Sequence, residues 1–265
     1  KEDACYLTSH VTAEPKAIAR ALAEHKDAFR NISYHNLLVM GEAPYCTPEM
    51  QGHFRYSTIF ACAETRGPIS HGQADFVPLY YHEYPKYVRE QLKPDVMILH
   101  VSEPDEHGWC SFGTAVDFQL AGAETASLVV AQVNRQMPRT LGDSKIHVTQ
   151  IDWMTEVDEA IPAIPPAKIG PVEQAIGANC ASLIRDRDCL QLGIGAIPDA
   201  VLKQLTDKRD LGIHSEMLSD SVAGLMEAGV ITNRYKTLNR GTAVATFAMG
   251  TQNLYQFMHN NPSVY

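Results

Sequence analysis

Nearly continuous apolar runs recur along the chain and predict buried β-strands. Five runs of four to eight residues contain β-branched side chains and little charge, which is typical of strands covered on both faces of a parallel sheet. They span residues 95–101, 126–133, 189–192, 211–214 and 243–248. Segments with apolar residues at helical spacing lie between these runs.

The helical segments have recognisable ends. Pro15 suits the first position of one helix. Another helix would be capped by Ser219 or Asp220 at its start and closed by Gly229 at its end. The predicted helices span residues 15–23, 85–92, 171–184, 198–205 and 219–228. Strands that alternate with helices in this way predict an α/β fold with a largely parallel sheet.

A stretch rich in proline and acidic residues divides the chain. It begins near Trp153 and contains Pro162, Pro165 and Pro166, a composition typical of an extended linker. We therefore expect an α/β domain at 1–155, a linker at 156–170 and the start of a second α/β domain at 171–265. The chain opens directly on an apolar stretch and stops in a turn followed by what resembles the first residues of a strand. We expect both ends to belong to incomplete domains.

Composition excludes several classes of function. Of 265 residues, 45% are hydrophobic and 20% charged, as in ordinary globular proteins. The net charge is −9 and Lys and Arg form no run, so we expect no nucleic-acid partner. No apolar stretch reaches the roughly 18 residues of a membrane span, and the first ten residues have no signal pattern. Six cysteines form no CxxC pair, so we expect reduced thiols, no metal site and a cytoplasmic protein.

The stretch 190–220, LQLGIGAIPDAVLKQLTDKRDLGIHSEMLSD, carries the candidate chemistry. A predicted strand leads through Gly193, Ile194, Gly195, Ala196 and Ile197 into a helix. Such a turn points backbone N–H groups and the positive end of a helix at an anion. A second predicted strand ends just before Glu216. Parallel strands present their carboxyl ends at one edge, so we expect the glycine-rich turn and Glu216 on the same edge.

The same pattern is compatible with a dinucleotide site. Two glycines followed about 20 residues later by an acidic residue would make Glu216 a ribose ligand of a nicotinamide-dependent oxidoreductase. That fingerprint requires a third glycine where this chain has Pro198. A plain strand-to-helix connection without function is a further interpretation. From these residues alone the three interpretations remain open.

Longer segments resemble one family. LQLGIGAIPDAVL and LGIHSEMLSD are similar to the acetyl-CoA hydrolase/transferase family, in particular to its 4-hydroxybutyrate CoA-transferases. The resemblance extends over nearly the whole chain, through HVTAEP (10–15), TRG (65–67), GQADFVP (72–78), VSEPDEHG (101–108) and GANCA (177–181). Family members are longer, and the second half of their pattern, with a later glycine-rich segment, does not occur in this sequence.

The resemblance implies a parallel-sheet, CoA-transferase-like (NagB/RpiA-like) fold built of two related halves. It implies that Glu216 is the catalytic nucleophile and that Gly193 to Ile197 lie against the thioester. Coenzyme A would pass between an acyl-CoA (4-hydroxybutyryl-, butyryl- or acetyl-CoA) and a carboxylate such as acetate, through a glutamyl-CoA thioester. No further cofactor is implied, and a homodimer or higher homo-oligomer is expected. A hydrolase that uses the same glutamate, and a fragment that binds without turnover, are the alternatives.

Three further residues are candidates for substrate contact. Glu14 could project into the site, or its carboxylate could lie in the first turn of the helix that follows. Arg66 could bind a substrate carboxylate or a CoA phosphate, or form a structural ion pair. Gln73, with Asp75 nearby, could donate or accept a hydrogen bond with the substrate.

Overall fold

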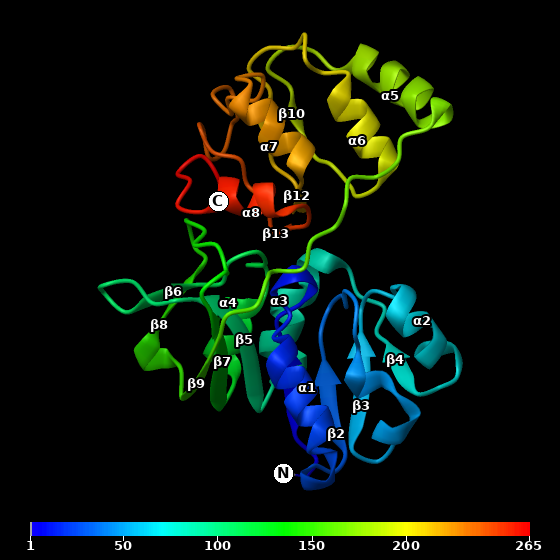
Figure 1. Cartoon of the computed structure of the whole chain (residues 1–265), viewed down its shortest axis with the longest axis vertical. Coiled ribbons are helices and arrows are strands. Elements are labelled where there is room, and N and C mark those ends of the chain that lie inside the picture. The colour runs from blue at the N-terminus through cyan, green and yellow to red at the C-terminus, as the bar shows by residue number, and fades with distance from the viewer. Residues whose placement is uncertain (1) are drawn as a thin grey trace. The chain divides into compact units, whose positions relative to one another are not determined.

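The computed structural model describes residues 2–265 and divides into two compact units (Figure 1). The first comprises the chain up to Met137 together with Ser144–Pro162, and the second comprises Pro138–Asp143 and Ala163–Tyr265. The main boundary, between Pro162 and Ala163, falls inside the stretch predicted as a linker. No helix of residues 2–265 has the length and apolar character needed to cross a bilayer.

The first unit is built on a seven-stranded sheet in which every pairing is parallel. The order is β4-β3-β2-β1-β5-β7-β9. These strands are β1 (Cys5–Thr8), β2 (Ile32–His35), β3 (Phe54–Thr58), β4 (Ala74–Phe76), β5 (Val96–Ser102), β7 (Leu128–Asn134) and β9 (Trp153–Val157). A separate antiparallel pair consists of β6 (Trp109–Ser111) and β8 (Lys145–His147).

Short helices connect these strands. They are α1 (Lys16–Glu24), α2 (Ala63–Ser70), α3 (Tyr84–Tyr87), which continues into a π-helical turn at Val88–Leu92, and α4 (Gln119–Thr125). Single 3₁₀ turns lie at Val11–Ala13, Lys26–Ala28, Pro44–Cys46, Pro48–Met50, Tyr81–Glu83 and Val148–Gln150. In Figure 1, α1 crosses in front of the sheet.

The predictions for 95–101 and 126–133 are confirmed as β5 and β7, shifted by one or two residues. All seven residues of β5 are buried, as expected for a central parallel strand. Asp95, predicted as the first residue of this strand, precedes β5. Its carboxylate accepts a hydrogen bond from the Cys5 N–H, at the start of β1, at 2.7 Å. The edge strand β9 ends at Val157, so the first two residues of the predicted linker 156–170 belong to the sheet of the first unit.

The second unit contains two short parallel pairs and four helices. The strands are β10 (Cys189–Leu190) with β11 (Gly212–Ile213), and β12 (Met217–Leu218) with β13 (Phe247–Ala248). The helices are α5 (Pro171–Leu183), α6 (Ala196–Lys203), α7 (Asp220–Glu227) and α8 (Gln252–Met258). Three predicted strands are thus present but shorter than expected; the run 243–248 pairs as a strand only at its end.

Helix ends follow local chemistry, with two corrections. Helix α7 begins after Ser219 and is followed by Gly229, whose φ of 74° is the left-handed conformation that glycine favours, as predicted. Helix α1 begins at Lys16, with Pro15 as the residue before it. Helix α6 begins two residues earlier than predicted, which places Pro198 at its third position. Proline is tolerated there because the first N–H groups of a helix have no partner within it.

Candidate active site

The carboxyl ends of β10 and β11 bring the glycine-rich turn and Glu216 together. Parallel pairing sets Leu190 beside Ile213, and the His214 N–H donates to the Leu190 carbonyl at 3.0 Å. Beyond the strands, the buried Ser215 hydroxyl accepts from the Leu192 N–H and donates to the Leu192 carbonyl, both at 3.0 Å. Gly193 follows Leu192 and Glu216 follows Ser215. Both are therefore next to a pair of residues that two hydrogen bonds hold together.

The turn itself is open. Gly195 has φ 111° and ψ −175°, a backbone conformation essentially restricted to glycine. A methyl group added to Gly193 or Gly195 would meet nothing within 4 Å, so a ligand can approach this backbone closely. Within residues 2–265, no protein atom accepts a hydrogen bond from the backbone N–H groups of 193–197. These groups and the start of α6 are available to an anionic oxygen.

Glu216 combines an exposed side chain with a fixed backbone. Its carbonyl accepts hydrogen bonds from the Thr246 N–H at 3.0 Å and the Thr246 hydroxyl at 2.6 Å, and a longer one from Phe247 at 3.3 Å. The next two residues, Met217 and Leu218, are buried in β12. The backbone that carries the carboxylate is therefore anchored on both sides, which is the arrangement that a positioned nucleophile requires.

A cavity of about 490 Å³ adjoins this turn. Gly193, Ile194 and Gly195 line it, together with Met217, the residue after Glu216. The Pro-rich segment 164–167 and parts of α6, α7 and the segment after β13 complete its wall; Glu216, Ala196 and Ile197 are not among its lining residues. Its volume lies within the range of small-molecule sites.

One wall of the cavity is held by Asp220, at the start of α7. Its carboxylate accepts hydrogen bonds from the Thr251 N–H at 2.8 Å and the Thr251 hydroxyl at 2.5 Å. A methyl group on Gly250 would collide with the same carboxylate, so glycine is required for this approach. The adjacent Ser221 hydroxyl donates to Asp199 of α6 at 3.0 Å. The two helices that border the cavity are thereby linked.

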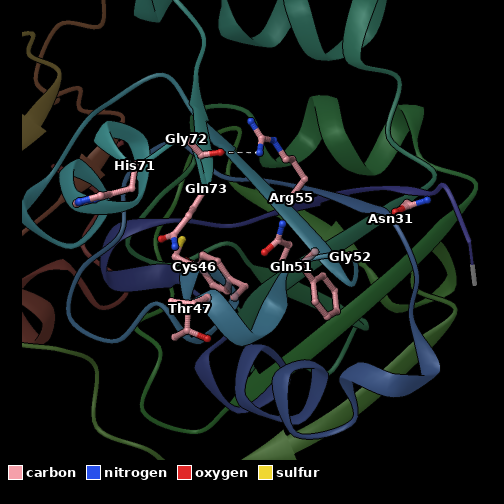
Figure 2. A pocket seen from close by; sticks show the side chains of 12 residues that line it. Asn31, Cys46, Thr47, Gln51, Gly52, Arg55, His71, Gly72 and Gln73 are labelled. Atoms are coloured by element: carbon pink, nitrogen blue, oxygen red, sulfur yellow. Dashed lines mark hydrogen bonds between the residues drawn. The ribbon is translucent and has the colours of Figure 1, made fainter.

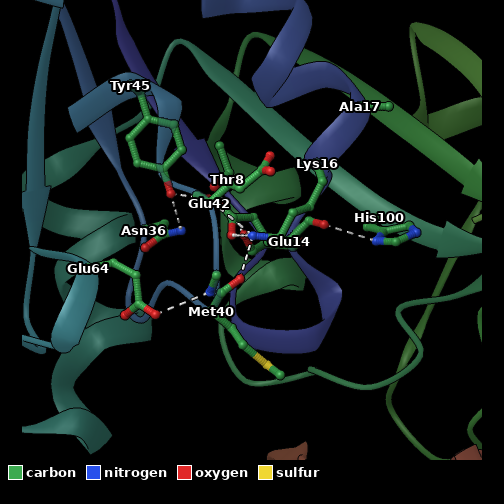
Figure 3. A network of polar contacts seen from close by, with 12 residues as sticks. Thr8, Glu14, Lys16, Ala17, Asn36, Met40, Glu42, Tyr45, Glu64 and His100 are labelled. Atoms are coloured by element: carbon green, nitrogen blue, oxygen red, sulfur yellow. Dashed lines mark hydrogen bonds and ion pairs between the residues drawn. The ribbon is translucent and has the colours of Figure 1, made fainter. Parts of the chain in front are cut away.

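The remaining candidates lie in the first unit. Glu14 follows β1 and is 1% exposed, and it precedes α1, so it is not a first-turn residue of that helix (Figure 3). Its carboxylate accepts hydrogen bonds from the Tyr45 hydroxyl at 2.5 Å and from Lys16 Nζ at 2.9 Å. Burial raises the pKa of Glu14, and these two partners act in the opposite direction.

Arg66 and Gln73 have different surroundings. Arg66 is exposed on α2, and its Nε donates a hydrogen bond to the Ala61 carbonyl at 3.1 Å. Among residues 2–265 Arg66 forms no ion pair, so the structural ion pair considered for it is absent. Gln73 lines a second cavity of about 360 Å³, with Arg55 (Figure 2). Asp75 is bound by Arg55 at 2.7 and 2.5 Å. Gln73 precedes β4 whereas Glu14 follows β1, so the parallel sheet separates them to opposite edges.

Sequence reasoning missed the polar partners of Glu14. Lys16 and Tyr45 carry no motif, and the contact of Tyr45 with Glu14 joins positions 31 residues apart. His100 left one signal, a polar residue inside the apolar run 95–101. It is buried, and burial lowers its pKa to about 4. A buried polar residue in a central strand requires partners, so this position could have been marked as part of a network.

A parallel α/β fold that presents a glutamate beside a glycine-rich turn with open N–H groups has the parts of an acyl-transfer site. The chain belongs to the acetyl-CoA hydrolase/transferase family: the model of the family's N-terminal domain matches residues 3–166. The chain is 48% identical over 257 residues to the 4-hydroxybutyrate coenzyme A transferase of Clostridium kluyveri, covering 97% of this chain and 60% of that protein.

Two further relatives agree. A succinyl-CoA:cyclohexane-1-carboxylate CoA transferase of Geobacter metallireducens is 38% identical over all of this chain and 60% of that protein. The crystal structure of 4-hydroxybutyrate CoA-transferase from Porphyromonas gingivalis superposes with a TM-score of 0.89 at 37% identity, covering 100% of this chain and 63% of that one. The chain therefore spans about 60% of the length of the curated relatives that it matches.

Proposed function

We propose that this protein is a CoA-transferase that moves coenzyme A between an acyl-CoA and a small carboxylate through a thioester on Glu216. The observation that carries the proposal is the placement of an exposed glutamate beside an open glycine-rich turn. The Ser215–Leu192 hydrogen bonds set that placement. Carboxylates are among the side chains that form covalent intermediates in acyl transfer.

The reaction balances without a further co-reactant. The Glu216 carboxylate attacks the thioester carbonyl, the C–S bond breaks, and an acyl–glutamyl anhydride and CoA thiolate result. The thiolate then attacks the glutamyl carbonyl, the anhydride C–O bond breaks, and the acyl group leaves as its carboxylate. Glutamyl-CoA remains on the protein. An acceptor carboxylate runs the same two steps in reverse and leaves as its CoA thioester.

The turn supplies electrostatic stabilisation in this scheme. Each attack creates a tetrahedral oxyanion, and the open N–H groups of 193–197, with the start of α6, offer donors to it. One such donor contributes on the order of 10²–10³-fold in rate. Pro198 has no N–H and follows this set, so the donors lie in the turn and in the first two helical residues, Ala196 and Ile197.

The substrates are proposed from the relatives and from the chemistry. 4-Hydroxybutyryl-, butyryl- or acetyl-CoA would be the donor and acetate or another small carboxylate the acceptor. Arg66, whose guanidinium is exposed, could bind a carboxylate or a CoA phosphate, and Gln73 could contact a substrate through hydrogen bonds. We also expect the protein to act as a homodimer or higher homo-oligomer in the cytoplasm.

Mass spectrometry tests the intermediate. The full-length protein is incubated with butyryl-CoA and then treated with borohydride, which reduces a glutamyl thioester to an alcohol. Glu216 should lose about 14 Da if it carries the intermediate. The variant Glu216→Gln should remain unmodified, whereas Glu227→Gln, which changes an exposed glutamate of α7, should be trapped as in the wild type. Absence of the mass change at Glu216 in folded wild-type protein would reject the mechanism.

A hydrolase would form the same intermediate and pass it to water. The acceptor distinguishes the two activities: a transferase releases free CoA slowly from butyryl-CoA alone and forms acetyl-CoA when acetate is added. A hydrolase releases CoA at the same rate with and without acetate. Quantifying acetyl-CoA by chromatography decides between them.

A further inference from the structure

The cavity beside the glycine-rich turn lies within the second unit alone, because all of its lining residues belong to Ala163–Tyr265. Apolar side chains form much of its wall, among them Met217 and Met249. The Ile164 N–H donates to the Gly250 carbonyl at 2.9 Å, which ties the Pro-rich part of the wall to the segment after β13. A wall of this kind suits the hydrocarbon part of a small ligand.

Two charged side chains of α6, Asp199 and Lys203, line the same cavity. Opposite charges four residues apart on a helix are neighbours and can form an ion pair. Among residues 2–265, however, Lys203 forms no ion pair. One oxygen of Asp199 instead accepts a hydrogen bond from the Ser221 hydroxyl of α7 at 3.0 Å. The ammonium of Lys203 and the second oxygen of Asp199 thus remain available to a ligand as donor and acceptor.

The position of this pair on α6 sets its distance from the glycine-rich turn. An α-helix rises about 1.5 Å per residue, so Asp199 lies about 6 Å and Lys203 about 12 Å along the axis from Gly195. Helical side chains lean back toward the start of the helix, which directs the long Lys203 side chain toward the helical turn that carries Asp199. The donor and the acceptor are therefore both about one helical turn away from the glycine-rich turn.

A four-carbon chain with a terminal hydroxyl matches this distance. With its carbonyl at the glycine-rich turn, an extended 4-hydroxybutyryl group places its hydroxyl oxygen about 5 Å away, since four bonds of about 1.5 Å separate the two groups. A hydroxyl both donates and accepts, so it can accept from Lys203 and donate to Asp199 at once. A terminal methyl group would leave both side chains without a partner, and a terminal carboxylate would face the carboxylate of Asp199.

We propose that Asp199 and Lys203 form a subsite for a terminal hydroxyl, here called the Asp199–Lys203 subsite, and that it selects 4-hydroxyacyl groups over plain acyl groups of the same length. The proposal rests on the proposed function, which places the thioester carbonyl at the glycine-rich turn. Both residues determine specificity in it and take no part in the chemistry at Glu216. A hydrogen bond to a charged group should raise the affinity for the hydroxylated chain on the order of 10-fold.

Calorimetry with unreactive ligands tests the subsite separately from the chemistry. The probes are S-(4-hydroxybutyl)-CoA and S-butyl-CoA, thioethers in which a CH₂ group replaces the thioester carbonyl and excludes acyl transfer. The ratio of their dissociation constants is measured for the full-length wild type, Lys203→Met and Asp199→Asn. Lys208→Met, which removes a lysine that follows α6 and does not line the cavity, is the control. A general disturbance of the fold weakens the binding of both probes alike, so it leaves the ratio unchanged.

The wild type should bind the hydroxylated probe about 10-fold more tightly than S-butyl-CoA, and Lys208→Met should keep this preference. Lys203→Met should lose the preference and Asp199→Asn should reduce it. A shorter pair of probes, S-(3-hydroxypropyl)-CoA and S-propyl-CoA, tests the distance from the turn. Its hydroxyl stops one bond short of the subsite, so the wild type should show a smaller preference with this pair.

Three results would overturn the proposal: a wild type without the preference, an unchanged preference in either folded subsite variant, or an equal preference with the shorter probes. Borohydride trapping is read separately. A preference that depends on Lys203, together with no mass change at Glu216, would support the subsite and reject the glutamyl mechanism. Trapping at Glu216 without the preference would reject the subsite and leave the mechanism supported.

Discussion

Protonation of His100 should destabilise the first unit, because its neighbours are arranged around the neutral ring. Nδ1 faces the Glu14 carbonyl, which can only accept, so Nδ1 carries the proton. Nε2 faces the amide nitrogens of Gln132 and Asn134 at 3.3 and 3.1 Å. The Gln132 oxygen accepts from Ala17 N–H and the Asn134 oxygen from Gln136 N–H, which fixes both amides with their NH₂ groups toward the ring. A second proton on Nε2 would meet two donors.

The size and sign of the effect follow from the pKa. Burial lowers the pKa of His100 from its ordinary value of 6.5 to about 4. Between these values the unfolded chain binds more protons than the folded one, so stability is complete above pH 6.5 and falls as the pH decreases. The loss reaches about 3 kcal/mol below pH 4, and about 2 kcal/mol of it is present by pH 5.

Urea unfolding at pH 7.5 and pH 5.0 measures this loss. Both tryptophans, Trp109 and Trp153, lie in the first unit, so their fluorescence reports its unfolding. His35 is also buried with a pKa lowered to about 4, and it contributes equally to the wild type and to His100→Gln. The variant should therefore lose about 2 kcal/mol less between the two pH values than the wild type. His82→Gln, at an exposed histidine of the same unit, should behave as the wild type.

Two results would refute this reasoning. One is an equal loss of stability in His100→Gln and wild type between pH 7.5 and 5.0. The other is a ring ¹⁵N spectrum in which His100 titrates at or above 6.5, or carries its proton on Nε2 at pH 7.5.

Three further substitutions have expected outcomes. Gly177→Ala should destabilise the second unit by about 1–3 kcal/mol, because its methyl group would lie 2.7 Å from a carbonyl oxygen of α6. Gly224→Ala should stabilise the unit by about 1 kcal/mol, because its methyl group would have no atom within 4 Å. Thermal unfolding followed by circular dichroism compares the two variants. Lys236→Met should lower the free energy of unfolding in urea by about 1–3 kcal/mol, because the buried ammonium donates to two main-chain carbonyls at 2.7 and 2.6 Å. Equal stability of the variant and the wild type would contradict this role. Gly195→Ala should lower the transferase rate on the order of 10²–10³-fold by disturbing the turn, and an unchanged rate would remove the turn from the mechanism.

The parts of the fold that follow a simple burial pattern could be predicted from the sequence. β5 and β7 are central strands, so most of their side chains are apolar on both faces. β2 and β3 were missed because polar side chains interrupt them. Arg55 of β3 is exposed and pairs with Asp75 of the neighbouring strand. The edge strand β9 was missed because acidic residues and prolines indicated a linker there. Its residues Trp153 to Glu156 are exposed, so they form no apolar run.

The candidate site also has one part that the sequence predicts and one part that it does not. The meeting of the glycine-rich turn and Glu216 could be predicted, because it depends only on two parallel strands ending at one edge. The contacts of Lys16 could not, because its hydrogen bond to the Met40 carbonyl joins positions 24 residues apart and uses a main-chain acceptor that every residue possesses. No residue type marks such a partner. Only the folded backbone determines which carbonyl faces the ammonium.

The packing of α6 differs from that of a dinucleotide site, although both begin with a strand and a glycine-rich turn. In the dinucleotide fingerprint, the third glycine lets the helix approach its own sheet closely. Here that position is Pro198, in the first turn of α6, and the glycine that permits close approach is Gly177 of α5, whose Cα faces the backbone of Ala200. The close contact of α6 is therefore with a neighbouring helix. The N–H groups of the turn stay open and Glu216, after β11, stays exposed beside them, which is the arrangement that the proposed acyl transfer would use.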